Sequence, residues 1–150
     1  MNFPVGDIIA KAYLPVSFET ITLELEKIKF NGYIIQSVKG SVMEEGALFF
    51  RDGKVSACVV ECLAVKANLK GNEAFKQFLN ETKGKGFFQT VKLTRTQVDL
   101  VTAFDQKILI TDEVNLKEVA KLIPNSFEDK FGLPQGKEDI LDKYGLGSLK

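Results

Sequence analysis

The most informative pattern of apolar residues lies in residues 46–65. Two apolar runs, rich in β-branched and aromatic residues, flank Asp52-Gly53, a dipeptide typical of a tight hairpin turn. A two-residue loop there places Ala47 opposite Cys58 and leaves apolar side chains on both faces of the ribbon. A sheet that is apolar on both faces has to be covered on both, by helices or by a second copy of the chain.

Apolar spacing and capping residues predict four helices. Thr94-Arg-Thr-Gln97 has the spacing of a capping box, and Asn72 and Asn115 stand where helix caps are common. Val98 and Phe104 are expected on the buried face of the helix that follows the capping box. The expected elements are helices near residues 17–29, 72–81, 95–110 and 115–123, strands at 33–38, 46–51, 54–65 and 87–93, and a short strand or helical turn at 7–13.

The last residues of the chain contain two similar endings, Asp129-Lys-Phe-Gly-Leu133 and Asp142-Lys-Tyr-Gly-Leu146. Each is suited to a helix that closes with glycine in the left-handed region. We therefore predict an α+β domain over residues 1–123, with a mainly antiparallel sheet centred on the 46–65 hairpin and flanking helices, followed by a helical C-terminal tail over residues 124–150.

Composition favours one soluble domain. The chain has 150 residues, of which 45% are hydrophobic and 27% charged. Acidic and basic residues balance at 20 each, so no overall positive field attracts nucleic acid or an anionic membrane. The start lacks a secretory pattern and no apolar run could cross a bilayer, so we expect a cytoplasmic protein. Cys58 and Cys62 lie too far apart on one strand to bridge, and we expect both to be buried and reduced.

The chain contains no histidine, so acid-base chemistry would need carboxylates, lysines or tyrosines. Glu44-Glu45 could supply paired carboxylates, although a solvated turn explains the pair. Asp105 with Asp112-Glu113 could coordinate a divalent ion, but an acidic loop before a helix capped by Asn115 explains them equally well. We therefore predict no catalytic residue, no metal and no cofactor.

Four segments carry a resemblance to known families. They are Gly32-Tyr-Ile, the hairpin over residues 45–57, Gly71-Asn-Glu-Ala-Phe75 and Gly86-Phe87. In this order they resemble an uncharacterised archaeal family of hypothetical proteins and, more distantly, the PatA-type N-terminal domains of bacterial response regulators. The resemblance implies an accessory or regulatory module and no known catalytic residues.

These observations favour a non-catalytic module that forms a homodimer or docks a protein partner, without nucleic acid or membrane. The expected partner contacts are two cations at the hairpin tip and apolar residues of the tail: Arg51, Lys54, Phe131, Leu133, Leu141, Tyr144 and Leu146. The alternative is a protein that holds a small apolar or mixed ligand between the sheet and four aromatic residues: Phe75, Phe78, Phe87 and Phe88. An enzyme that uses carboxylates or a metal is a third hypothesis.

Overall fold

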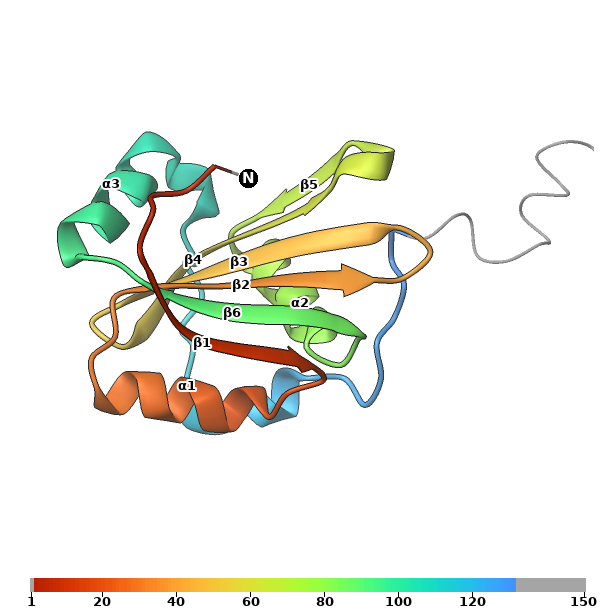
Figure 1. The fold of residues 1–150 in the computed structure, drawn as a ribbon, viewed down its shortest axis with the longest axis horizontal. Helices are drawn as coiled ribbons and strands as arrows, with labels where there is room; N and C mark the ends of the chain where they lie inside the picture. The colour runs from red at the N-terminus through yellow and green to blue at the C-terminus, as the bar shows by residue number, and fades with distance from the viewer. Residues whose placement is uncertain (1, 132–150) are drawn as a thin grey trace, which may run out of the picture.

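The computed structural model describes residues 2–131 and confirms the α+β class (Figure 1). One six-stranded antiparallel sheet has the order β1-β6-β2-β3-β4-β5. Its strands are β1 (Asp7–Leu14), β2 (Gly32–Lys39), β3 (Met43–Arg51), β4 (Lys54–Cys62), β5 (Ala67–Lys70) and β6 (Gly86–Lys92). The α-helices are α1 (Phe18–Lys27), α2 (Asn72–Glu81) and α3 (Arg95–Phe104), and the 3-10 segments are η1 (Leu63–Val65), η2 (Gln106–Ile108) and η3 (Leu116–Leu122).

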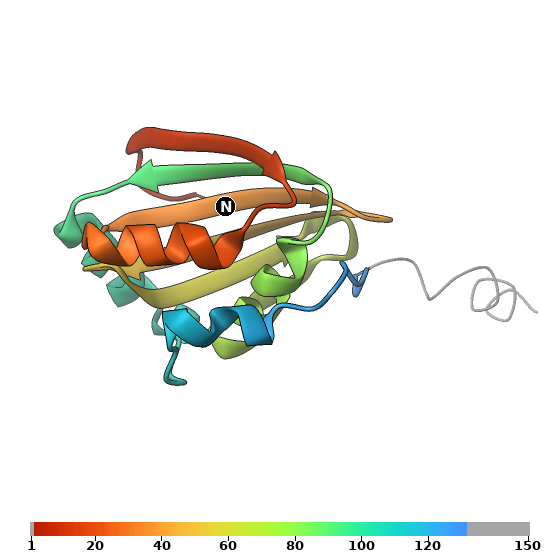
Figure 2. The same cartoon turned by 90° about the horizontal axis from the view of Figure 1, so that it is seen from below.

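The first face of the sheet is covered by α1, α2 and η3, which lie side by side over it (Figure 2). Phe50 of β3 and Phe88 of β6 meet Phe78 of α2 in one buried core. Phe18 of α1 also joins this core, with its ring centroid 5.7 Å from that of Phe78. Burial of large aromatic side chains makes this face the main source of apolar stabilisation.

The second face is covered over part of its area by α3 and the N-terminal segment. Val98 of α3 packs with Tyr33 and Phe49, and Phe3 closes over these two rings at centroid distances of 5.5 and 4.9 Å. Val91 of β6 belongs to the same cluster. The prediction that both faces are apolar and need cover is confirmed, and the chain's own elements supply much of that cover.

The hairpin turn at Asp52-Gly53 and the predicted pairing of Phe50 with Val55 are confirmed, but the predicted register beyond Phe50 is wrong. Both turn residues have positive φ, 51° and 84°, as the mirror-image turns favoured in hairpins require. The register shifts between Phe49 and Phe50, so Ala47 pairs with Val59 and not with Cys58. A β-bulge of this kind adds one unpaired residue to one strand, here Ser56, which local sequence pattern does not reveal.

The second hairpin strand also ends earlier than predicted. β4 stops at Cys62, and residues 63–65 form the 3-10 segment η1 where a strand was expected. The chain then turns back into β5, which pairs with β4 and was not predicted. Cys58 and Cys62 are both buried and free, as expected.

The capping box at Thr94 is confirmed, since Gln97 N donates to Thr94 Oγ1 and Thr94 N donates to Gln97 Oε1. The predicted extension of this helix to residue 110 is wrong. α3 ends at Phe104 because the next residue, Asp105, accepts a bond from Lys107 N and opens η2. Phe104 therefore stands at a helix end, 88% exposed, and not on the buried face.

Two predicted helix starts differ in detail. Asn72 is the first residue of α2, not its cap, because its Oδ1 accepts from Thr111 N and Asp112 N on a distant loop. Asn115 does cap, by accepting from Lys117 N, but it opens a 3-10 segment and not an α-helix.

Within the predicted tail, residues 124–131 are described and contain no helix. They pack along the first face, where Asn80 of α2 binds both the N–H and the C=O of Glu128, at 2.8 and 2.7 Å. Asp129 accepts from Ser41 N of the β2–β3 turn at 2.6 Å. The remaining tail residues, 132–150, lie outside the described part, so the domain boundary at residue 123 stays a prediction.

Replacement of Gly53 by alanine tests the turn. An added Cβ would lie 2.8 Å from Glu26 O and 2.9 Å from Glu26 Cα, and the positive φ is strained for alanine. We expect Gly53→Ala to lower the free energy of unfolding by about 1–3 kcal/mol in urea titrations. The neighbouring exposed change Lys54→Ala is the control, with an expected effect within about 0.5 kcal/mol. Equal effects of the two changes would contradict this account of the turn.

Candidate functional site

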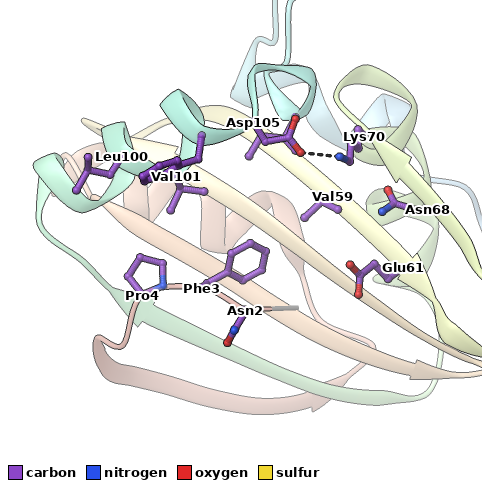
Figure 3. Close-up of a pocket in the computed structure, with 12 residues that line it drawn as sticks. Asn2, Phe3, Pro4, Val59, Glu61, Asn68, Lys70, Leu100, Val101 and Asp105 are labelled. Carbon is purple, nitrogen blue, oxygen red and sulfur yellow. Dashed lines mark hydrogen bonds and ion pairs between the residues drawn. The ribbon is translucent and has the colours of Figure 1, made fainter.

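A groove lies on the second face of the sheet, beside α3 (Figure 3). Its volume is about 580 Å³. It lies where the cover supplied by α3 and the N-terminal segment stops short of β4 and β5. The lining residues come from those four elements and from η2: Asn2, Phe3, Pro4, Val59, Glu61, Asn68, Lys70, Leu100, Val101, Phe104, Asp105 and Ile108.

Apolar side chains form one part of the groove. Leu100 and Val101 project from α3 and face Phe3 and Pro4 of the N-terminal segment across the opening, as Figure 3 shows. Phe3 is fixed by its ring contacts with Tyr33 and Phe49, and these contacts hold the N-terminal wall in place. This part of the groove can remove the body of an apolar ligand from water.

Polar side chains form the part of the groove that lies toward β5. In the β4–β5 ladder Val59 pairs with Lys70 and Glu61 pairs with Asn68, and all four residues line the groove. Lys70 Nζ lies 2.6 Å from Asp105 Oδ2, so an ion pair links β5 to the end of α3 (Figure 3). Both side chains are about one-third exposed. The pKa of Asp105 is lowered from its ordinary value, mainly by the hydrogen bond from Lys70.

The hairpin tip holds α3 against the sheet. Arg51 Nε donates to Asp99 Oδ1 of α3 at 2.7 Å, and Asp52 accepts ion pairs from Arg51 and from Arg95 at 3.5 and 3.2 Å. The hydrogen bond from Arg51 lowers the pKa of Asp99. Arg51, predicted as a contact for a partner, is therefore engaged within the chain, whereas Lys54 is exposed at the tip.

A second group of polar side chains is buried beneath the first face. Glu44 of β3 is 1% exposed and Glu81 of α2 is 0% exposed, so the expectation of a solvated turn at Glu44 was wrong. Gln77 Nε2 donates to Glu44 Oε1 at 2.6 Å, and Gln36 Nε2 donates to Glu81 Oε1 at 3.1 Å. Gly46 leaves room for this group, because a Cβ there would lie 2.3 Å from Glu81 Oε1.

The pKa of Glu81 is raised well above its ordinary value. The main cause is burial, and the hydrogen bond and negative charge of Glu44 add to it. Cys58, whose thiol pKa is raised by burial and by the charge of Glu81, also faces this group, and Glu45 contributes from β3. Neither the Glu44 nor the Glu81 carboxyl lines the groove.

Comparison with known proteins identifies the family. Residues 1–104 match the DUF2226 family, described as uncharacterised proteins conserved in archaea. This chain belongs to the DUF2226 family. An uncharacterised protein of Archaeoglobus fulgidus is 23% identical over 154 aligned residues, which cover 97% of this chain and 57% of that protein. No solved structure matches this DUF2226 chain.

Of the four aromatic residues predicted to line a pocket, the DUF2226 structure brings three together and leaves Phe87 apart. Phe75, Phe78 and Phe88 belong to the first-face core, whereas Phe87 lies on the second face beside Tyr13, with ring centroids 6.5 Å apart. Their β-strand and helix positions were predicted correctly, but adjacent strand residues point to opposite faces.

Of the predicted partner contacts in the tail, Phe131 is partly buried against the first-face core. The other four lie outside the described residues: Leu133, Leu141, Tyr144 and Leu146. Asp105, one of the carboxylates considered for a metal, is paired with Lys70. No group of three or more metal-ligating side chains was found in the described range.

Sequence reasoning missed most of the groove. Phe3 and Pro4 lie in a segment without periodicity, and the polar end depends on β5, which was not predicted. One residue did indicate the groove. Leu100 lies beside the buried stripe of α3 and is half exposed. An apolar residue just outside a buried stripe indicates a surface that other atoms cover only in part.

Glu81→Gln tests the buried acid pair through the pH dependence of stability. Because the folded-state pKa of Glu81 is raised, the folded protein holds a proton that the unfolded chain releases above its ordinary pKa of 4.5. The free energy of unfolding is therefore expected to fall, by up to about 1.4 kcal/mol per pH unit, as pH rises from that value toward the folded pKa.

Glutamine is neutral at every pH, so we expect the Glu81→Gln protein to lose this slope in urea titrations between about pH 5 and pH 8. Glu73→Gln, an exposed change in the same helix, is the control and should keep the slope of the unaltered protein. If the Glu81→Gln protein kept the slope of the unaltered protein, the Glu44–Glu81 pair would not be the cause of the pH dependence of stability.

Proposed function

We propose that this protein is a non-catalytic binding module whose groove beside α3 holds a small molecule with an apolar body and a polar end. The observation that supports the proposal most is the groove itself, with a volume of about 580 Å³. Small-molecule sites are concave, mostly apolar, carry a few placed polar groups, and span about 300–1,000 Å³. The groove has each of these properties.

The other face and the two edges of the sheet are less suited to binding a ligand or a partner. The first face is closed by α1, α2 and η3. The edge strand β1 has a register irregularity between Ile8 and Ala10 and an exposed cation at Lys11, and both features discourage pairing with another strand. The opposite edge, β5, has only four residues, which limits any added strand.

The chemistry of the lining supports binding and not catalysis. Its titratable groups are the Lys70–Asp105 ion pair and Glu61, and the lining contains no serine, threonine, cysteine or tyrosine that could act as a nucleophile. The buried Glu44 and Glu81 carboxyls lie beneath the first face, in contact with core side chains and away from the groove.

A second candidate function is docking of a protein partner or of a second copy of the chain. It is favoured by apolar side chains that are largely exposed: Val5 at 91%, Phe104 at 88% and Tyr13 at 83%. Leu100 and Phe104 border the groove, so a partner could extend over its rim.

The distant similarity to PatA-type regulatory domains and a cytoplasmic location stay predictions. None of the helices in residues 2–131 has the length and apolar character needed to cross a bilayer.

The neutral apolar dye N-phenyl-1-naphthylamine, which fluoresces when it leaves water, tests the proposed function. We expect the unaltered protein to bind it, and a Leu100→Ser/Phe104→Ser double variant to bind at least about tenfold more weakly, because the α3 wall loses two apolar side chains. Both side chains are at least half exposed, so the fold should persist.

Ala103→Ser is the matched control, since Ala103 is exposed on the same helix and does not line the groove. It should leave dye binding unchanged. Absence of dye binding by the unaltered protein, or equal binding by the double variant and the control, would contradict the proposal.

A further inference from the structure

The polar end of the groove carries charges of both signs within one small region. The Lys70 ammonium and the Asp105 carboxylate pair at 2.6 Å, and the Glu61 carboxylate lines the same end. From this arrangement, and resting on the proposed function, we propose that the groove selects an amphipathic ligand with an uncharged hydrogen-bonding head group, such as a primary amide, over a carboxylate or an amine.

The two members of the ion pair are not equivalent as binding groups. Asp105 is held in place, because its Oδ1 accepts from Lys107 N at 3.1 Å while its Oδ2 accepts from Lys70. The Lys70 ammonium has three N–H donors, and its bond to Asp105 uses one of them. The polar end therefore presents a donor beside a carboxylate that already serves two other groups.

Asp105 already neutralises the charge of Lys70, so a carboxylate head at this end could accept from a remaining Lys70 N–H but would find no uncompensated positive charge. An amine head would likewise meet an Asp105 carboxylate that is already paired with Lys70. In either case the ligand would bring a charge that the Lys70–Asp105 pair does not neutralise next to an apolar wall, where an unpaired charge is costly.

An uncharged amide avoids both costs. Its C=O can accept from a remaining N–H of Lys70, and its NH₂ can donate to an oxygen of Asp105. The Lys70–Asp105 pair stays intact, and the apolar body of the ligand lies against Phe3, Leu100 and Val101. Hydrogen bonds to charged groups in such surroundings are stronger than those between neutral groups.

Three chain-matched probes test the selectivity. Octanamide, octanoate and octylamine have the same alkyl body, and at neutral pH their heads are uncharged, negative and positive respectively. In competition with bound N-phenyl-1-naphthylamine, we expect octanamide to displace the dye at a concentration at least about tenfold lower than either ion.

Two variants should reverse the selectivity in opposite directions. Asp105→Asn keeps the oxygen that accepts from Lys107 N but removes the charge that neutralises Lys70, so octanoate should gain affinity by about tenfold relative to octylamine. Lys70→Met leaves Asp105 unpaired, so octylamine should gain by a similar factor relative to octanoate. Lys76→Met, on an exposed position of α2 outside the groove, should change neither ratio.

The possible outcomes separate this inference from the proposed function. Equal displacement by the three probes, stronger displacement by either ion from the unaltered protein, or unchanged ratios in both groove variants would overturn the head-group selectivity. In each of these cases dye binding would still support the groove as a binding site. A protein that binds neither the dye nor any of the three probes would overturn the proposed function and the inference together.

Discussion

The structure depends on one constraint, which is that its sheet is apolar on both faces. Phe50 and Phe88 point to the first face while Phe49 and Tyr33 point to the second, so neither face can be left in water without a large cost in free energy. Three helical elements close the first face. On the second face α3 and the N-terminal segment cover only part of the area, and the groove lies where this cover ends.

The polar groups on the two faces of the sheet differ in burial, because the first face is fully covered and the second is covered only in part. Beneath the closed face, Glu44 and Glu81 accept hydrogen bonds from amide side chains, and burial, with the hydrogen bond and charge of Glu44, raises the pKa of Glu81. At the open face, Lys70 and Asp105 form an ion pair and retain partial contact with water. The polar groups beneath the fully covered first face therefore serve packing, whereas those on the partly covered second face remain accessible from the groove.

The contacts that shape the groove are also contacts that stabilise the fold. Arg51 and Asp99 hold α3 to the hairpin tip, Phe3 anchors the N-terminal wall on two aromatic rings, and Lys70 and Asp105 link β5 to the end of α3. Each joins segments distant in the sequence. The walls of the groove are accordingly fixed by long-range contacts within the chain, which suits the proposed binding of a small molecule at a site formed before the ligand arrives.

The sequence by itself determined the features that depend on neighbouring residues. Asp52-Gly53 dictates a tight turn because both positions need positive φ, and Thr94 with Gln97 starts a helix because each side chain reaches the backbone of the other. Tertiary structure alone decided the bulge that shifts the hairpin register, the burial of Glu44 and the meeting of Lys70 with Asp105. The physical reason is that turns and caps are made within a few residues, whereas register, burial and ion pairing are set by partners brought together only when the chain packs.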